Sequence, residues 1–323
     1  MRAATYSETG PSSVLRVAQV ERPEPGLGEV RVRLRVAGVN PSDWKARARG
    51  VVRGAFQIPG QDGAGEIDAV GEGVDPARTG ERVWVWFAAH RRPWGTTAQW
   101  TVVPARQAVP LPAAVGFDVG ATLGIPALTA HRCLTADGPV AGLPVLIAGG
   151  AGAVGHAAIG LARWLGADPV IATVSGPEKG ELARAAGAHA VVDYRAPDAD
   201  EQIRALAPGG VARVVEVALS RNLALDLAVC ARGATIAAYA DELPVTVTEL
   251  PAQLIRRGLA LRGVLIYATP RQALDDAVAG VTDALGEGRI ASPLLHRFPL
   301  EQAGSAHDAV ERGAVGKVLI DLP

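Results

Sequence analysis

The chain has 323 residues, enough for about two domains of ordinary size. Hydrophobic residues make up 49% of it and charged residues 20%, a balance that supports packed cores and excludes disorder over most of its length. With 32 Lys and Arg against 33 Asp and Glu, the formal net charge of -1 provides no cationic field for nucleic acid or anionic lipid.

Cysteine content and apolar patterning narrow the class further. Cys133 and Cys230 are the two cysteines, too few for a disulfide framework or a four-thiolate zinc site. Residues 1–8 lack the apolar stretch of a signal peptide, and no run of about 18 apolar residues offers a membrane span. We therefore expect a soluble, globular, cytoplasmic protein.

Residues 1–122 are interrupted by Pro and Gly and contain short strand-like runs. The clearest is Glu29–Asn40, in which apolar residues alternate with Arg31, Arg33 and Arg35. A period of two is typical of a strand with one buried face and one wet face. Gln61–Val70 and Arg82–Phe87 are further strand candidates between turn signals. The pattern predicts an antiparallel, partly open β domain.

From about Pro144 the pattern changes to strands that alternate with helices, which predicts a parallel sheet covered on both faces. The predicted strands are Val145–Ala148, Val170–Val174, Ala190–Asp193, Val211–Val217, Thr235–Tyr239 and Ala260–Leu265, and the first helices are Ala153–Leu165 and Pro177–Ala186. After Tyr267 we expect helices at Pro270–Leu285 and Glu301–Glu311, a strand near Phe298 and a strand at Lys317–Leu322. This tail is expected to return to the first domain.

A glycine-rich turn follows the first of these parallel strands. Gly150, Gly152 and Gly155 match G-x-G-x-x-G between a strand and a helix. In such a turn the first glycine permits the tight bend, the second admits a pyrophosphate to the backbone N–H groups, and the third lets the helix pack closely. The segment predicts a dinucleotide site made by Gly150, Ala151, Gly152, Ala153, Val154 and Gly155.

The end of the next strand indicates which dinucleotide is bound. An NAD site has a carboxylate there for the ribose 2′-hydroxyl, but this strand runs into Ser175 and Gly176 with no acid, and Lys179 follows. A hydroxyl and an ammonium suit a 2′-phosphate. Lys179 is one of three lysines in the chain, so we expect NADPH rather than NADH.

These features resemble the medium-chain dehydrogenase/reductase superfamily, and within it the zinc-free quinone oxidoreductases related to zeta-crystallin. The segments that carry the resemblance are Ala37–Lys45, Pro59–Gly65, Gly124–Ala130, Val192–Arg195 and Gly316–Ile320. The resemblance implies an α/β fold: a GroES-like β-rich catalytic domain, residues 1–122 and 267–323, and a doubly wound Rossmann domain, residues 123–266. It also implies homodimerisation.

The resemblance further implies a site without metal. In zinc alcohol dehydrogenases of the superfamily, the position of Asn40 holds a Cys ligand and that of Gln61 a His ligand, and neither amide replaces them. Asn40, Asp43 and Thr129 are the implied catalytic residues. Those implied around the cofactor, besides the glycine turn, are Ser175, Lys179, Tyr194, Tyr239 and Leu265.

Structural roles remain open for several of these residues. Asn40 before Pro41 suits an Asx-type turn, and Asp43 suits a helix N-terminus. The Thr129 hydroxyl can bond its own helix, and Tyr194 can be a strand-end aromatic. Arg312 and Lys317 are expected to be surface residues, with added charge at the nucleotide site as the alternative.

The predicted activity is hydride transfer from NADPH to a quinone or a related electron-poor, carbonyl-conjugated acceptor. The segment 45–53 has none of the tyrosines common in quinone reductases, so an α,β-unsaturated ketone or thioester is an alternative acceptor. Two competing hypotheses are a nucleotide-binding, crystallin-like protein with little turnover and an NADH-dependent enzyme. No nucleic-acid or membrane partner is expected.

Overall fold

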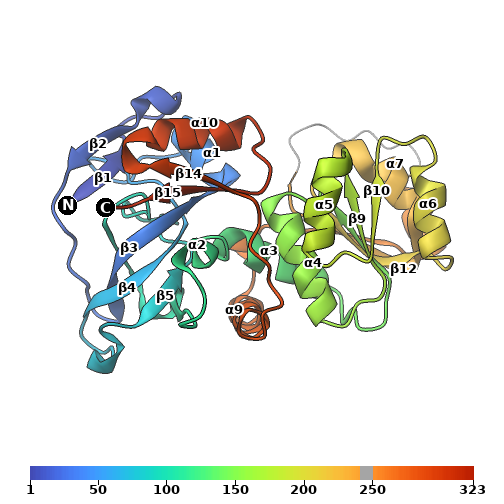
Figure 1. The fold of residues 1–323 in the computed structure, drawn as a ribbon, viewed down its shortest axis with the longest axis horizontal. Coiled ribbons are helices and arrows are strands. Elements are labelled where there is room, and N and C mark those ends of the chain that lie inside the picture. The colour runs from blue at the N-terminus through green and yellow to red at the C-terminus, as the bar shows by residue number, and fades with distance from the viewer. Residues whose placement is uncertain (241–249) are drawn as a thin grey trace. The chain divides into compact units, whose positions relative to one another are not determined.

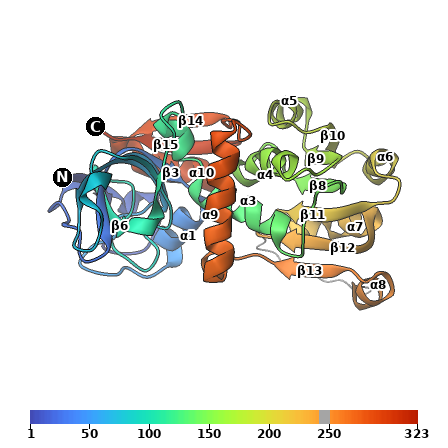
Figure 2. The same cartoon turned by 90° about the horizontal axis from the view of Figure 1, so that it is seen from below.

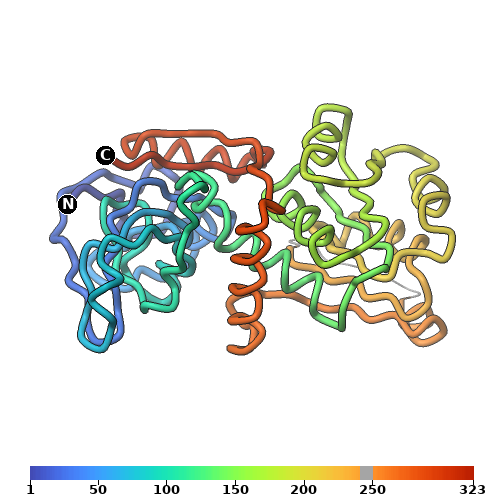
Figure 3. The backbone as a smooth tube through the Cα atoms, turned by 60° about the horizontal axis from the view of Figure 1, so that its bottom comes forward, coloured from blue at the N-terminus to red at the C-terminus, as the bar shows by residue number. Residues whose placement is uncertain are grey.

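The computed structural model describes residues 1–240 and 250–323, which fold into two compact units (Figure 1). The first unit comprises residues 1–125 and 294–323, and the second comprises residues 126–293. Both chain termini therefore belong to the first unit, and Figure 3 lets the reader follow the chain out of it and back. Residues 294–323 thus belong to the same unit as residues 1–125.

A seven-stranded sheet forms the body of the first unit, with β6 paired to the outer part of β3. The order of the main path is β14 (Leu295–Pro299), β15 (Lys317–Asp321), β3 (Glu29–Val39), β4 (Asp62–Val70), β5 (Arg82–Val85) and β7 (Ala108–Pro110), with β6 at Trp100–Pro104. Neighbouring strands are antiparallel except for β14 and β15, which are parallel because helix α10 (Ala303–Glu311) connects them. A separate two-stranded sheet pairs β1 (Arg2–Thr5) with β2 (Arg16–Gln19).

Strand β3 shows how the alternating pattern is used. Val30, Val32 and Leu34 are buried in the core of this sheet, as their period of two predicts. The predicted wet face is only partly wet, because Arg31 is 6% exposed. Its guanidinium bonds Asp68 at 2.9 Å and Glu24 at 2.6 Å, so carboxylates replace the lost water.

The second unit contains a six-stranded sheet in which every neighbouring pair is parallel, as predicted. Its order is β10 (Ala190–Asp193), β9 (Val170–Val174), β8 (Val145–Ala148), β11 (Val211–Glu216), β12 (Cys230–Ala238) and β13 (Ala260–Gly263), and Figure 2 shows these strands side by side. This 3-2-1-4-5-6 order is that of a dinucleotide-binding doubly wound sheet, with the chain reversing direction across the sheet at β8.

Helices cover both faces of the parallel sheet. α4 (Ala153–Trp164) and α5 (Pro177–Ala185) pack together over β8, β9 and β10, whereas α6 (Ala199–Leu206) and α7 (Leu219–Val229) pack over β10, β11 and β12. Ile171 and Val192 are apolar strand residues in the core beneath α6 and α7. α8 (Leu250–Arg257) packs on β12.

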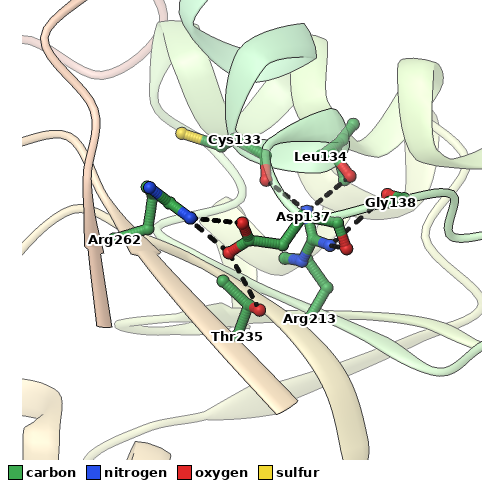
Figure 4. Close-up of polar contacts among 7 residues, drawn as sticks. All are labelled: Cys133, Leu134, Asp137, Gly138, Arg213, Thr235 and Arg262. Carbon is green, nitrogen blue, oxygen red and sulfur yellow. Dashed lines mark hydrogen bonds and ion pairs between the residues drawn. The ribbon is translucent and has the colours of Figure 1, made fainter. Parts of the chain in front are cut away.

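Helix α3 (Gly124–Thr135) ends on a buried arginine from the parallel sheet. Figure 4 shows the Arg213 guanidinium among the carbonyls at and after the last turn of α3. Arg213 donates to the carbonyl oxygens of Cys133 at 2.9 Å, Leu134 at 2.6 Å and Asp137 at 2.9 Å. These carbonyls lack partners within the helix, so the arginine fastens the helix end to strand β11.

The second unit extends further along the chain than predicted. Its boundary lies at residue 294 rather than 267, because α9 (Arg271–Gly286) packs on α4. A Cβ on Gly280 of α9 would lie 2.5 Å from the ring of His131, and one on Gly160 of α4 would lie 2.4 Å from the carbonyl of Arg289. Glycines at these contacts let the helices approach closely. Among the described residues, none of the helices combines the length and apolarity needed to cross a membrane.

Candidate functional site

The glycine-rich turn joins the end of β8 to the start of α4. Gly149 adopts φ +69°, so the left-handed residue of the bend is one position earlier than the predicted Gly150. Gly150 has a packing role instead, because a Cβ there would lie 2.8 Å from Ala172 on the neighbouring strand β9. The Gly150 N–H donates to the carbonyl oxygen of Thr173 at 3.0 Å, and this bond attaches the turn to β9.

No side chain caps the N-terminus of α4. Gly152 is the N-cap of α4 and makes no side-chain cap, while a Cβ on Gly155 would lie 2.3 Å from the Gly149 carbonyl. Gly155 is therefore needed for the close approach of helix and turn. The first-turn N–H groups of α4, which include those of Ala153 and Val154, have no partner within the helix and carry its positive dipole end. This cradle fits a diphosphate.

Ser175 and Lys179 come together at the end of β9. The Lys179 ammonium donates to the Ser175 hydroxyl at 2.8 Å, and both side chains are half-buried. Between them Gly176 (φ +137°) is the N-cap of α5, again without a side-chain cap. Tyr194, which follows β10, is 43% exposed, and its N–H donates to Val174 at 3.1 Å. No carboxylate occupies the end of β9, where the Lys179 ammonium lies beside the Ser175 hydroxyl.

The remaining predicted cofactor residues lie elsewhere in the second unit. Tyr239 follows β12, where its N–H donates to Glu216 at 3.0 Å, and burial raises the pKa of its hydroxyl. Leu265 follows β13 and is 63% exposed. Thr129 is a buried residue of α3, 4% exposed. The contacts of these three residues with cofactor stay predictions.

Asn40 and Asp43 lie in the first unit, in a cluster of buried charged and amide groups. Asn40 follows β3 and is the N-cap of α1 (Pro41–Arg49), and its N–H donates to the Asp43 carboxylate at 2.7 Å. Its amide Nδ2 donates to Asp62 at 2.7 Å, and its Oδ1 accepts from Lys317 at 2.6 Å. Asn40, Asp43, Asp62 and Lys317 are each at most 2% exposed.

Lys317 is buried, so the expectation that it is a surface residue is wrong. It is the first residue of β15, which pairs with β3, and its ammonium lies 3.2 Å from the Asp62 carboxylate. A Cβ on Gly38 would lie 2.9 Å from Lys317 Cε, so the glycine before Val39 and Asn40 leaves room for the lysine. Asp62 and Lys317 were missed as partners because strand pairing, rather than local pattern, brings them together.

Burial controls the protonation of the two carboxyls. Burial is the main cause that raises the pKa of Asp43 to about 7, and the charge of Asp62 adds to it. Burial also raises the pKa of Asp62, against the opposing effects of Lys317 and of hydrogen bonds from Asn40 and the Ile125 N–H. Asp43 Oδ1 accepts no hydrogen bond from the described residues. The cluster thus holds a carboxyl that exchanges its proton near neutral pH.

Two family models match the chain. "Alcohol dehydrogenase GroES-like domain" covers residues 26–113, in the first unit, and "Zinc-binding dehydrogenase" covers residues 153–282, in the second. The residues present do not fit zinc. The Asn40 amide is bonded to Asp62 and Lys317, position 61 is Gln, and the ammonium in the cluster repels a dication. Among the described residues, no group of three or more His, Cys, Asp or Glu is placed to hold a metal.

Full-length relatives extend the comparison. The chain is 28% identical to a quinone oxidoreductase of Lama guanicoe, over 100% of this chain and 98% of the relative. It is 30% identical to a 2-haloacrylate reductase of Burkholderia, over 99% and 98%. A solved mycobacterial structure complexed with NADPH is 31% identical, covers 99% of this chain and 100% of its own, and superposes with a TM-score of 0.84.

The fold, the glycine-rich turn and the comparisons with known proteins all point to the same family for both units. The strand order and glycine turn are those of a nucleotide-binding sheet, and the matches extend over nearly the whole chain. The chain belongs to the medium-chain dehydrogenase/reductase superfamily, with quinone oxidoreductases among its relatives, and is an oxidoreductase.

Proposed function

We propose that this oxidoreductase uses NADPH, without a metal, to reduce a quinone or a related electron-poor, carbonyl-conjugated acceptor. The observation that carries the proposal is the hydrogen bond of 2.8 Å from the Lys179 ammonium of α5 to the Ser175 hydroxyl, which directly follows β9. It accompanies the glycine-rich turn at the N-terminus of α4. When bound, NADPH supplies the hydride.

The second unit supplies the groups for cofactor binding. The N–H groups at the start of α4 hold the diphosphate, and Gly150 and Gly155 let the turn pack closely against β9 and α4, which positions these N–H groups. Ser175, Lys179 and the exposed Tyr194 surround the 2′-phosphate, where a carboxylate would repel it. Tyr239 and Leu265 border the rest of the cofactor, with Thr129 near its nicotinamide end.

The first unit supplies Asn40 and Asp43. Asn40 is held by Asp62 and Lys317, which fix the orientation of its amide, and its Nδ2 has a second hydrogen to donate to a carbonyl oxygen. The Asp43 carboxylate accepts a hydrogen bond from the Asn40 N–H and so holds the Asn40 backbone in place. Their catalytic contribution is positioning of the acceptor, which is a large effect when the reactants are aligned.

An enone or related conjugated acid is the second candidate for the acceptor. The specific support is the full-length similarity to a 2-haloacrylate reductase, together with the absence of tyrosine from residues 45–53. Both acceptor classes take hydride at an electron-poor conjugated carbon, so the same site serves either.

The decisive experiment is steady-state oxidation of saturating NADPH against a panel of quinones, enones, haloacrylates and enoyl thioesters. We expect acceptor-dependent turnover with at least one class, and the ratio of kcat/KM between classes identifies the acceptor. Tight NADPH binding with no turnover on any acceptor would instead favour a crystallin-like binding protein.

Lys179→Ala tests the choice of cofactor. Removal of the ammonium is expected to weaken NADPH binding about tenfold, through the loss of a charge-assisted bond, and to leave NADH binding unchanged. Calorimetry with both nucleotides measures this. Arg184→Gln, which removes one positive charge from the far end of the same helix, is the matched control. An unchanged NADPH/NADH ratio in Lys179→Ala would contradict the role of Lys179 as a ligand of the 2′-phosphate.

We also propose a homodimer. Among the described residues β13 is the last strand of the parallel sheet, and Leu261 within it and Leu265 after it are 39% and 63% exposed. A last strand with exposed apolar side chains favours pairing with a second copy of the chain.

A further inference from the structure

Arg195 lies beside the predicted 2′-phosphate site. In the parallel pairing of β10 with β9, Asp193 is opposite Val174, so the residues after Asp193 run alongside Ser175 and Gly176. A Cβ on Gly176 would lie 3.6 Å from Nη2 of Arg195. The guanidinium is therefore next to the turn on which Lys179 and Ser175 meet.

Asp193 holds this guanidinium in a defined orientation. One carboxylate oxygen accepts from Nε at 3.0 Å and the other from Nη2 at 2.7 Å, a bidentate arrangement. The backbone N–H of Arg195 donates to the same carboxylate at 3.0 Å. Nη1 has no acceptor in the part of the chain that the structure describes, and the side chain is 58% exposed. Arg195 therefore has donors left for a ligand.

The pair also determines the charge of the site. Asp193 ends β10, directly beside the turn that follows β9, and if unpaired it would repel a phosphate. Arg195 pairs with it, so an unpaired Asp193 carboxylate does not oppose the Lys179 ammonium beside Ser175. Loss of Arg195 thus removes donors and at the same time exposes an anion.

We propose that Arg195 is a further ligand of the cofactor 2′-phosphate, held for this purpose by Asp193, and that it contributes to NADPH selectivity alongside Lys179. The inference rests on the proposed use of NADPH. It assigns to Asp193 a positioning role, because Asp193 acts through the guanidinium and does not itself contact the phosphate.

The test uses adenosine 2′,5′-bisphosphate and 5′-AMP, which differ only in the 2′-phosphate, in calorimetry on the full-length protein. Arg195→Gln is expected to weaken bisphosphate binding more than tenfold and to leave 5′-AMP binding within about twofold. The double variant Asp193→Asn/Arg195→Gln removes the exposed anion as well, so we expect it to recover a good part of that loss. Arg184→Gln controls for the change in net charge and is expected to match the wild type.

The outcomes separate the inference from the proposed function. If the wild type prefers the bisphosphate and Arg195→Gln keeps the same preference, or loses both probes equally, the role of Arg195 is overturned while NADPH use stands. If the wild type itself shows no preference, NADPH specificity and the role of Arg195 fail together. Selective loss in Arg195→Gln with recovery in the double variant supports the inference.

Discussion

At the scale of single residues, the buried ammonium of Lys317 has a large energetic consequence. It lies 3.2 Å from Asp62 and 2.6 Å from the Asn40 amide oxygen, in a site from which water is excluded. A buried charge is tolerated when paired and bonded, and removal of one partner leaves the other uncompensated. The orientation of Asn40 therefore depends on a residue near the other end of the chain.

Lys317→Met is expected to reduce the free energy of unfolding of the first unit by about 3–5 kcal/mol, because Asp62 is left buried without its cation. Tryptophan fluorescence in urea measures this, since Trp164 is the one tryptophan of six outside the first unit. The double variant Asp62→Asn/Lys317→Met, which leaves no unpaired charge, is expected to regain at least half of the loss. A double variant less stable than the single one would contradict this account.

The Asp43 carboxyl makes stability depend on pH. Its pKa of about 7 lies above the unfolded value of 3.8, so the folded chain keeps a proton that the unfolded chain has lost. This stabilisation is complete below pH 3.8 and is lost as pH rises to 7. Relative to Asp43→Asn, the wild type should lose roughly 2–3 kcal/mol between pH 5 and pH 8. Urea unfolding at the two pH values checks it, and a constant difference would place the titration elsewhere.

At the scale of elements, the connection between α3 and β11 is the clearest case of an arginine that replaces a helix cap. Arg213 is 3% exposed and bonds three carbonyls at the end of α3, whereas the nearby Arg262 forms an ion pair with Asp137 while 47% of its side chain is exposed (Figure 4). The two arginines are neighbours with different burial, which makes them a matched pair.

Arg213→Met should destabilise the second unit by about 2–4 kcal/mol, because several buried carbonyls lose their donor. Arg262→Met should change stability by less than about 1 kcal/mol, since its ion pair is open to solvent. Hydrogen exchange of α3 amides, measured by mass spectrometry, distinguishes the two. Equal effects would show that burial does not decide the contribution.

Much of this element structure is predictable from the sequence, and its exceptions have physical causes. The alternation in β3, the apolar strand β8 and the glycine turn all depend on local pattern, which sequence carries directly. The burial of Lys317 does not, because its partners Asn40 and Asp62 are far away in sequence. The same is true of α9, because its sequence pattern predicts a helix but does not indicate the unit to which the helix belongs.

At the scale of the whole molecule, the expected assembly depends on β13, the last strand of the parallel sheet among the described residues. The proposed homodimer predicts a light-scattering mass twice that of the chain. Leu261→Lys, which places charge on this strand, should shift the mass toward that of the monomer. Leu143→Lys is a control at an exposed leucine, 40% exposed, that is not on this strand. A dimer unaffected by Leu261→Lys would place the interface elsewhere.

In the sequence, the second unit lies between the two segments of the first unit, so the ribosome synthesises all of the second unit before it finishes the first. Lys317 and Asn40 are 277 positions apart, so the early strands emerge long before β15 is synthesised. The parallel sheet is complete in translation while the N-terminal sheet still has an open edge beside β3 and an uncompensated Asp62. A nascent chain paused before β15 therefore carries a finished nucleotide-binding half and an unfinished half that exposes strand edge to chaperones.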